Sequence, residues 1–239
     1  MSADQRPDPR PTTQAVAVYE LLLSDIRSGA LEPGMPLRTE LLKSRYGSGV
    51  SPTREALARL AAEHFVTAEG KKGFRVARIT RADFEELVAI RKELEVRAME
   101  LAIRNGNDDW EAQIVASYHH LTKTHPPGLP LAAAAEEERE RRHRDFHYAL
   151  LAGCRSRWLL RFCDRLTSHL ERYRRILNPR AIISTGIADE IEEEHRALMM
   201  AMIERDPARA AALIERHRDR TYDVILARFE TYEHRFAAE

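Results

Sequence analysis

Four histidines in the C-terminal two-thirds of the chain lie on the apolar faces of three predicted helices. His143 and His147 are four residues apart and therefore project from one helix face. His195 and His217 each continue an apolar stripe at helical spacing in a separate segment. A buried imidazole is costly unless its nitrogens find partners, and imidazoles from three helices can find one in a shared divalent ion. Neutral imidazole suits zinc, nickel, copper or iron, so the pattern predicts a metal site.

A second unusual residue, Arg91, stands in the middle of an otherwise apolar helical stripe. A guanidinium that points into a helical bundle requires an anion. Glu95, four residues later, can supply that anion, and the alternative is a small carboxylate ligand gripped by two hydrogen bonds. On a later predicted helix, Arg172 and Arg174 flank an apolar stripe near Tyr173, and either arginine is expected to close the same pocket. These four residues, Arg91 included, are the predicted ligand-binding set.

The segment Ser51–Leu57 has the features of a helix start, and it indicates a second kind of site, one that contacts DNA. Ser51 is a good N-cap and Pro52 suits the first helical position. In a helix-turn-helix the first residues of the second helix contact base edges, and Arg54 there can grip guanine or a phosphate. An isolated arginine more often pairs with a surface carboxylate, which is the alternative for Arg54. The predicted DNA-contacting residues are Arg38, Lys43, Arg45, Ser51, Thr53, Arg54, Lys71, Lys72 and Gly73.

Two sets of elements must position these residues. The N-terminal third is predicted to hold helices at 13–28, 39–46 and 51–63, followed by strands at 65–68 and 74–77. The strands flank a basic, glycine-rich turn, so we expect a winged helix-turn-helix over residues 13–78, after a disordered lead-in at 1–12.

Residues 81–235 are predicted to be entirely helical, as an antiparallel bundle of six or seven helices. The expected helices cover 81–105, 108–124, 131–153, 156–177, 187–205 and 206–232, with a short turn at 180–184 as a possible seventh. The fold class is therefore mainly α. The charge-rich start of the third helix is interpreted as a solvated face.

Composition narrows the partners and the compartment. The net charge is zero, but residues 1–79 carry 12 Lys and Arg against 9 Asp and Glu, which makes this third the candidate nucleic-acid surface. No apolar run approaches the ~18 residues of a membrane span, and the start has no apolar signal-peptide core. The two cysteines, Cys154 and Cys163, fit a reducing compartment, so a cytoplasmic location is expected.

The N-terminal pattern resembles the winged helix of GntR-family bacterial regulators. The resemblance covers residues 13–78 and is carried by Leu37, Leu41-Leu42, Tyr46-Gly47, Pro52-Thr53-Arg54-Glu55-Ala56-Leu57, Leu60, Val66 and Gly73-Phe74-Arg75-Val76. It implies a homodimer that binds a palindromic operator in double-stranded DNA. Val50 stands where the family usually has an arginine, so the operator preference of typical members does not carry over.

The remainder, 81–235, resembles the FCD-type ligand domain of the FadR subfamily. The matching features are Arg91-x-x-Leu94-Glu95, Phe146-His147, Glu194-His195 and His217. The resemblance implies a divalent metal, usually zinc- or nickel-like, held by one Asp and three His, and a small carboxylate that completes its shell. His143 stands at the Asp position here, with Asp145 close by in sequence, so the predicted ligands are four histidines.

Within that subfamily, Arg91, Val50 and the run from His143 to His147 resemble the carbon-starvation-induced regulators that sense glutarate. The sequence is therefore expected to encode a repressor that senses a small carboxylate, for example a dicarboxylate such as glutarate, with no catalytic residues. A metal-dependent enzyme in a helical bundle is the alternative, although no His-Glu-x-x-His motif is present. A structural bundle with ordinary histidines is the third interpretation.

Overall fold

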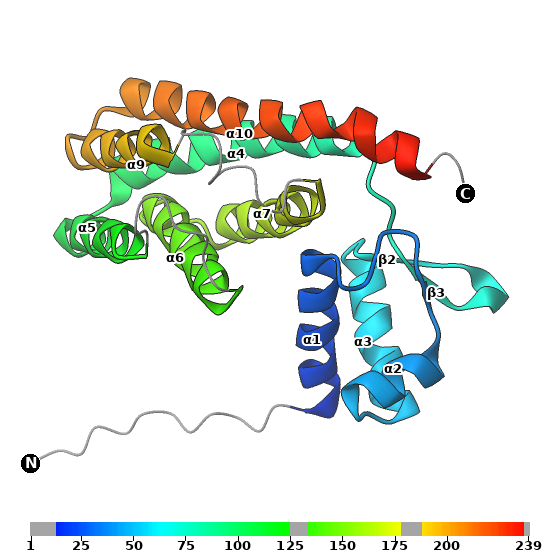
Figure 1. The fold of residues 1–239 in the computed structure, drawn as a ribbon. Helices are drawn as coiled ribbons and strands as arrows, with labels where there is room; N and C mark the ends of the chain where they lie inside the picture. Colours follow the sequence, from blue (N-terminus) through cyan, green and yellow to red (C-terminus); the bar gives the residue numbers. More distant parts are fainter. Residues whose placement is uncertain (1–12, 125–132, 178–187, 237–239) are drawn as a thin grey trace, which may run out of the picture. The chain divides into compact units, whose positions relative to one another are not determined.

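The structure is a computed structural model that describes residues 13–124, 133–177 and 188–236 (Figure 1). The chain divides into two compact units, Met1–Thr80 and Arg81–Glu239. The expected lead-in at 1–12 and the expected turn at 180–184 lie outside the described residues. Each unit is described by itself.

The first unit consists of three helices and a small antiparallel sheet. Its elements are α1 (Gln14–Ser28), β1 (Pro36–Leu37), α2 (Thr39–Tyr46), α3 (Val50–Ala62), β2 (Val66–Ala68), the single turn η1 (Gly70–Lys72) and β3 (Phe74–Val76). The strand order is β1-β3-β2, so β3 pairs on both sides. Strands β2 and β3 form the predicted hairpin. The sequence did not predict β1, because two residues are too short to show an alternating pattern.

Local sequence sets the ends of α1. The side chain of Thr13 accepts a hydrogen bond from the Val16 backbone N–H and caps the first turn. Gly29 ends the helix in the left-handed conformation, with φ of 80°, and donates its N–H to the Ile26 carbonyl. The inward face packs on α3 and the sheet in one apolar core (Figure 1), which includes Val18, Leu22, Ile26, Leu42, Leu57, Leu60 and Val76.

The start of α3 differs from the prediction. The helix begins at Val50 with Gly49 as its N-cap and without a side-chain cap, so the prediction of Ser51 as N-cap is wrong. Thr53 instead fixes this end from inside: its hydroxyl donates to the Gly49 carbonyl at 2.8 Å and shares a hydrogen bond of 2.7 Å with the Ser48 hydroxyl. The Thr53 side chain is fully buried as a result.

The second unit consists of helices and the segments that join them, with no strand among its described residues, and confirms the predicted fold class. Its helices are α4 (Arg81–Asn105), α5 (Asp108–Thr122), α6 (Ala133–Ala152), α7 (Arg157–Leu177), α9 (Ala188–Ile203) and α10 (Pro207–Phe236). Helices α4 and α10 run side by side along the unit, and α9 packs against α10 (Figure 1). No helix among the described residues is both long and apolar enough to cross a membrane.

Two sets of contacts made by aromatic side chains fix the frame around the site. Trp110 of α5 donates its indole N–H to the Ala149 carbonyl of α6 at 2.9 Å. A Cβ at Gly106 would lie 2.0 Å from the Trp110 ring, so only glycine allows the ring to pack there. At the other end, the rings of Phe84, Tyr173 and Phe229 join α4, α7 and α10, with centroids 5.3 to 6.1 Å apart. These contacts hold α6 and α10, which carry three of the four histidines.

Candidate functional site

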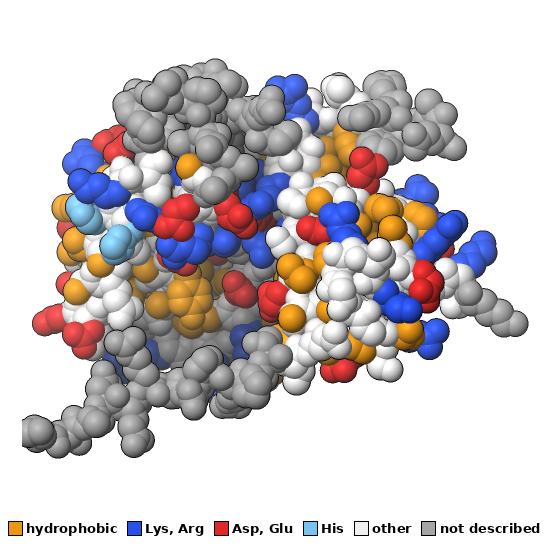
Figure 2. Space-filling model, turned by 60° about the horizontal axis from the view of Figure 1, so that its bottom comes forward, with side chains coloured by type: hydrophobic (Ala, Val, Ile, Leu, Met, Phe, Trp, Pro, Cys, Tyr) orange, Lys and Arg blue, Asp and Glu red, His pale blue; other side chains and the backbone are white. Residues whose placement is uncertain are grey.

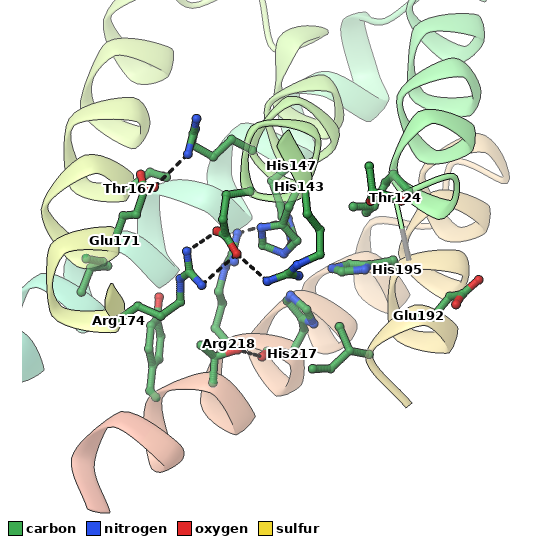
Figure 3. A pocket seen from close by; sticks show the side chains of 18 of the residues that line it. Thr124, His143, His147, Thr167, Glu171, Arg174, Glu192, His195, His217 and Arg218 are labelled. Atoms are coloured by element: carbon green, nitrogen blue, oxygen red, sulfur yellow. Dashed lines mark hydrogen bonds and ion pairs between the residues drawn. The ribbon is translucent and has the colours of Figure 1, made fainter. Parts of the chain in front are cut away.

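The structure brings the four histidines together. Helix α6 supplies His143 and His147, α9 supplies His195 and α10 supplies His217 (Figure 3). One ring nitrogen from each lies within 4.8 Å of the corresponding atoms of the other three. His143 is half-buried and the other three are buried. Atoms at this spacing can be ligands of one ion, as the helical stripes of the sequence predicted.

The surroundings keep these rings neutral. Burial, together with the neighbouring histidines and Arg218, lowers the pKa of His143 and of His147 well below 6.5. Burial and the adjacent His217 do the same to the pKa of His195. Burial also lowers the pKa of His217, although the Glu194 carboxylate opposes it. A neutral imidazole keeps a lone pair on one nitrogen, which is the form that binds metal.

Two further observations fit a metal. The Nδ1 atom of His217 donates to the Glu194 carboxylate at 2.9 Å, which leaves Nε2 as the lone-pair nitrogen. A carboxylate behind a histidine in this way is a common support of a metal-bound ring. In addition, the Nε2 atom of His195 is buried and has no hydrogen-bond partner among the described residues. A divalent ion between the rings would satisfy that nitrogen.

The remaining ring contact in the cluster involves a guanidinium. Arg218 of α10 donates to Nδ1 of His147 at 3.2 Å, and Nε2 of His147 lies 3.2 Å from Nε2 of His143. Because Nδ1 accepts in this contact, the His147 proton is on Nε2, between the two rings. Binding of a metal through Nε2 would move that proton to Nδ1 and break the contact with Arg218.

The sequence left two candidates for the anion that pairs with Arg91, Glu95 or a bound ligand, and in the structure the partner is Glu95. Arg91 Nε donates to one oxygen of Glu95 at 2.8 Å, and Arg218 Nε donates to the other at 2.9 Å. Burial raises the pKa of Glu95, but the two guanidinium groups outweigh it and lower the pKa to about 2. Arg91 still lines the pocket described next. Its charge is nevertheless already matched by the chain's own carboxylate.

A cavity of about 130 Å³ opens beside the histidines. Since one water needs roughly 10–15 Å³ on this scale, the space suits a small organic molecule rather than a nucleotide or a lipid. The polar side chains that line it are Tyr118, Thr122, Thr124, Thr167, Thr221, Tyr222, the four histidines, Arg91, Arg139, Arg144, Arg174, Arg218, Glu140, Glu171 and Glu192 (Figure 3). Arg174 is therefore where the sequence predicted it.

Two other predicted pocket residues lie elsewhere. Tyr173 is fully buried between Phe84 and Phe229, and Arg172 is buried with its guanidinium 5.5 Å from the Tyr173 ring centre. Neither lines the cavity, so the prediction of Arg172 and Tyr173 as ligand-binding residues is wrong. Successive helical residues are about 100° apart, and only Arg174 of the three faces the cavity. Asp145 is likewise not at the cluster: its side chain is 55% exposed and pairs with Arg141.

Sequence reasoning missed three cavity arginines, Arg139, Arg144 and Arg218. Arg139 and Arg144 belong to the charged stretch that was interpreted as a solvated face. In the structure Arg139 binds Glu140 at 2.6 Å and Arg144 binds Glu171 of α7 at 2.8 Å. The position of Arg218 directly after His217 was the available signal, but adjacent helical residues seldom share a face.

In the first unit, several predicted DNA-contacting residues are accessible. Arg38, Ser51, Arg54 and Lys72 are exposed, and Arg54 makes no ion pair with any residue that the structure describes. Gly73 follows η1 with φ of 89°, a conformation that favours glycine. On the face of the molecule drawn in Figure 2, Lys and Arg side chains are interspersed with Asp and Glu side chains.

Other members of the DNA-contacting set have partners within the domain. Arg45 pairs with Asp25 of α1 at 2.7 Å, and Lys43 pairs with Glu40 at 3.0 Å. Thr53 is fully buried, so the prediction that it contacts DNA is wrong. The side chain of Lys71 is outside those that the structure describes.

Comparison with known proteins places both units in one family. The model for "Bacterial regulatory proteins, gntR family" matches residues 14–76, and the FCD domain model matches residues 86–220. The chain is 38% identical over 202 residues to the HTH-type transcriptional repressor GlaR of Escherichia coli. The matched region covers 83% of this chain and 90% of GlaR. It is 33% identical over 225 residues to the HTH-type transcriptional regulator BphR of Paraburkholderia xenovorans, across 93% of this chain and 90% of BphR.

A solved structure agrees at the level of the fold. Escherichia coli McbR/YncC superposes with a TM-score of 0.73 at 22% identity, over 92% of this chain and 99% of that one. These matches are to transcriptional regulators, which argues against the alternative of a metal-dependent enzyme. The chain belongs to the GntR family of bacterial transcriptional regulators and carries the FCD domain of its FadR subfamily.

Proposed function

We propose that this protein is a transcriptional repressor that senses a small carboxylate in a metal-containing pocket. The observation that carries the proposal is the meeting of four neutral imidazoles from α6, α9 and α10 beside a cavity lined with arginines. A metal ion and a set of guanidinium groups are the two usual means by which a protein holds a carboxylate. The name of the similar protein GlaR, a repressor, supports the direction of regulation.

The proposed cofactor is a zinc or nickel ion held by His143, His147, His195 and His217. Four neutral imidazoles suit these ions better than magnesium or calcium, which prefer oxygen ligands. When bound, the ion would supply a positive charge and an attachment point for a carboxylate oxygen. The chain's own residues would position the ligands: Glu194 orients His217, and the surrounding helices bury the rings of His147, His195 and His217.

The charge of the pocket favours a dianion as the effector. Five arginines line the cavity against three glutamates, and Glu95 behind the lining is shared by Arg91 and Arg218, so one positive charge remains before any ion binds. A divalent metal held by neutral histidines adds two more positive charges. A dicarboxylate matches this surplus better than a monocarboxylate, and glutarate, sensed by the carbon-starvation-induced regulators that the sequence resembles, is the candidate.

The output is proposed to be binding of a homodimer to a palindromic operator in double-stranded DNA. Arg54 at the start of α3 would contact a base or a phosphate, with Arg38 and Lys72 as further contacts. A carboxylate can release the operator only if it binds the DNA-free state more tightly than the DNA-bound state. The proposal therefore requires glutarate and DNA to weaken the binding of each other by the same factor.

Fluorescence anisotropy with the DNA that flanks the protein's own gene tests this proposal. Zinc-loaded protein should bind a specific fragment, and glutarate should weaken that binding. Arg54→Ala should weaken it by roughly 10- to 100-fold, as expected for loss of one good base contact. Arg59→Ala is the control, because it removes the same charge from α3 at a side chain held against Tyr19 and Glu63. Equal binding by wild type and Arg54→Ala would refute the assigned contact.

A further inference from the structure

The cavity contains a carboxylate of the chain itself. Glu140, on α6, is only 4% exposed yet lines the cavity. Arg139 donates to its Oε1 atom at 2.6 Å, and Arg174 of α7 donates to the same atom at 3.0 Å. The second terminal nitrogen of Arg174 binds Oε2, so Arg174 holds both oxygens (Figure 3). Two guanidinium groups thus form an anion site with a carboxylate already in it.

This arrangement differs from the other buried carboxylate of the pocket region. Glu95 is held between Arg91 and Arg218 and does not line the cavity, so a solute has no access to it. Glu140 and both of its arginine partners do line the cavity. A small anion in the cavity can therefore reach the guanidinium groups that bind Glu140. The fork of Arg174 accepts any carboxylate in the same two-bond geometry.

The anion site lies next to the histidines rather than in a separate chamber. Arg139, Glu140 and Arg174 line the same cavity as all four histidines. Figure 3 shows Arg174 and the histidines on either side of one space. A single small molecule can span from the imidazole cluster to the guanidinium pair.

We propose that Arg139 and Arg174 form the subsite for the second carboxylate of a dicarboxylate effector, and that Glu140 is a resident counter-ion which the effector displaces. The inference rests on the proposed function, because it assumes that the first carboxylate is bound at the histidines. It makes the arginine pair the determinant that selects dicarboxylates over monocarboxylates. It also makes Glu140 a competitor of the effector, since both need the same donors.

Displacement also has a structural consequence. Glu140 lies on α6, and its side-chain ion pair with Arg174 links α6 to α7. An effector that takes over Arg174 releases this link while supplying equivalent hydrogen bonds. The freed Glu140 side chain then loses its pairing, and this cost reduces the affinity for the effector in the wild type.

Titration calorimetry with the zinc-loaded full-length protein tests the inference with two probes, glutarate and pentanoate, which share a five-carbon chain but differ by one carboxylate. Glu140→Gln removes the competing charge and keeps the side-chain shape. Glutarate should bind this variant at least tenfold more tightly than wild type, as expected for charge-assisted contacts that no longer have to be exchanged. Pentanoate should bind both within about twofold. Glu138→Gln, a carboxylate on the outer side of α6 paired with Arg141, is the matched control.

A second variant gives the opposite sign. Arg174→Gln should reduce glutarate binding to the level of pentanoate, and thermal unfolding of each variant verifies that it is folded. Unchanged or weaker glutarate binding by Glu140→Gln, with wild type binding glutarate, would overturn the subsite but leave the proposed function standing. Wild-type protein that binds neither acid would overturn the proposed function and the subsite with it.

Discussion

Replacement of Glu194 by glutamine tests whether the histidine cluster is a metal site. The carboxylate accepts the Nδ1 proton of His217 at 2.9 Å and is itself buried. Its negative charge strengthens His217 as a donor and stabilises positive charge at the ring. Glutamine can still accept the hydrogen bond but has no charge. The fold should therefore survive, while the affinity for a metal ion at Nε2 should fall.

The expected magnitude follows from the position of Glu194 behind a single ligand. Loss of such a supporting carboxylate costs roughly 10- to 100-fold in metal affinity. That is about 1.4 to 2.7 kcal/mol at a fixed excess of zinc. For a protein of this size, each kcal/mol moves the midpoint of thermal unfolding by about 2–4 °C. The rise in Tm caused by zinc should therefore be about 3–11 °C smaller in Glu194→Gln than in wild type.

The assay is thermal unfolding of each protein after chelation and again with a defined excess of zinc. Glu193→Gln is the control, because Glu193 is adjacent on α9 but exposed and paired with Arg196. It should show the wild-type rise. Equal zinc-induced rises in all three proteins would refute the supporting role of Glu194. No rise in wild type, together with no bound ion by elemental analysis, would refute the metal site itself.

Two further predictions concern the buried charges. Glu95, with a pKa of about 2 against an ordinary 4.5, contributes stability that is complete above pH 4.5 and is lost as the pH falls towards 2. Between pH 4.5 and 2, the free energy of unfolding measured with urea should therefore fall by about 3 kcal/mol more in wild type than in Glu95→Gln. Parallel pH profiles of the two proteins would contradict this. Arg218→Met removes the donor to His147 Nδ1. The zinc affinity, measured by competition with a chelating dye, should therefore rise about tenfold, although the fold loses stability. Weaker zinc binding would show instead that Arg218 assists the metal.

The histidine cluster could be predicted because its signal is periodic. His143 and His147 share a helix face by spacing alone, and His195 and His217 lie on apolar stripes that a bundle must bury. The helix bounds were predictable for the same reason, and α4 spans the predicted 81–105. What the sequence does not contain is the contact between helices, which brings the three stripes to a common point.

The cavity wall was harder to predict because its residues are charged. An arginine in a charged stretch has the same sequence signature whether it faces solvent or an internal carboxylate, so Arg139 and Arg144 were assigned to a solvated face. In α7, where Arg172 and Arg174 both flank an apolar stripe, spacing could not show which side meets the cavity. The prediction that Thr53 contacts DNA failed for a related reason: its hydroxyl is polar, but it donates a hydrogen bond to the Gly49 carbonyl at the buried start of α3.

Shared carboxylates, rather than apolar contacts alone, link the helices around the cavity. Each of three glutamates is held by two arginines: Glu95 by Arg91 and Arg218, Glu140 by Arg139 and Arg174, and Glu171 by Arg144 and Arg175. The first joins α4 to α10, and the other two join α6 to α7. Packed apolar cores resist small displacements, whereas ion pairs can exchange one carboxylate for another of similar geometry. Among the described residues, Glu140 and Glu171 line the cavity, whereas Glu95 does not, although its partners Arg91 and Arg218 do. We therefore expect an acidic effector to exchange with a carboxylate of the α6–α7 pair and to leave the Glu95 link between α4 and α10 in place.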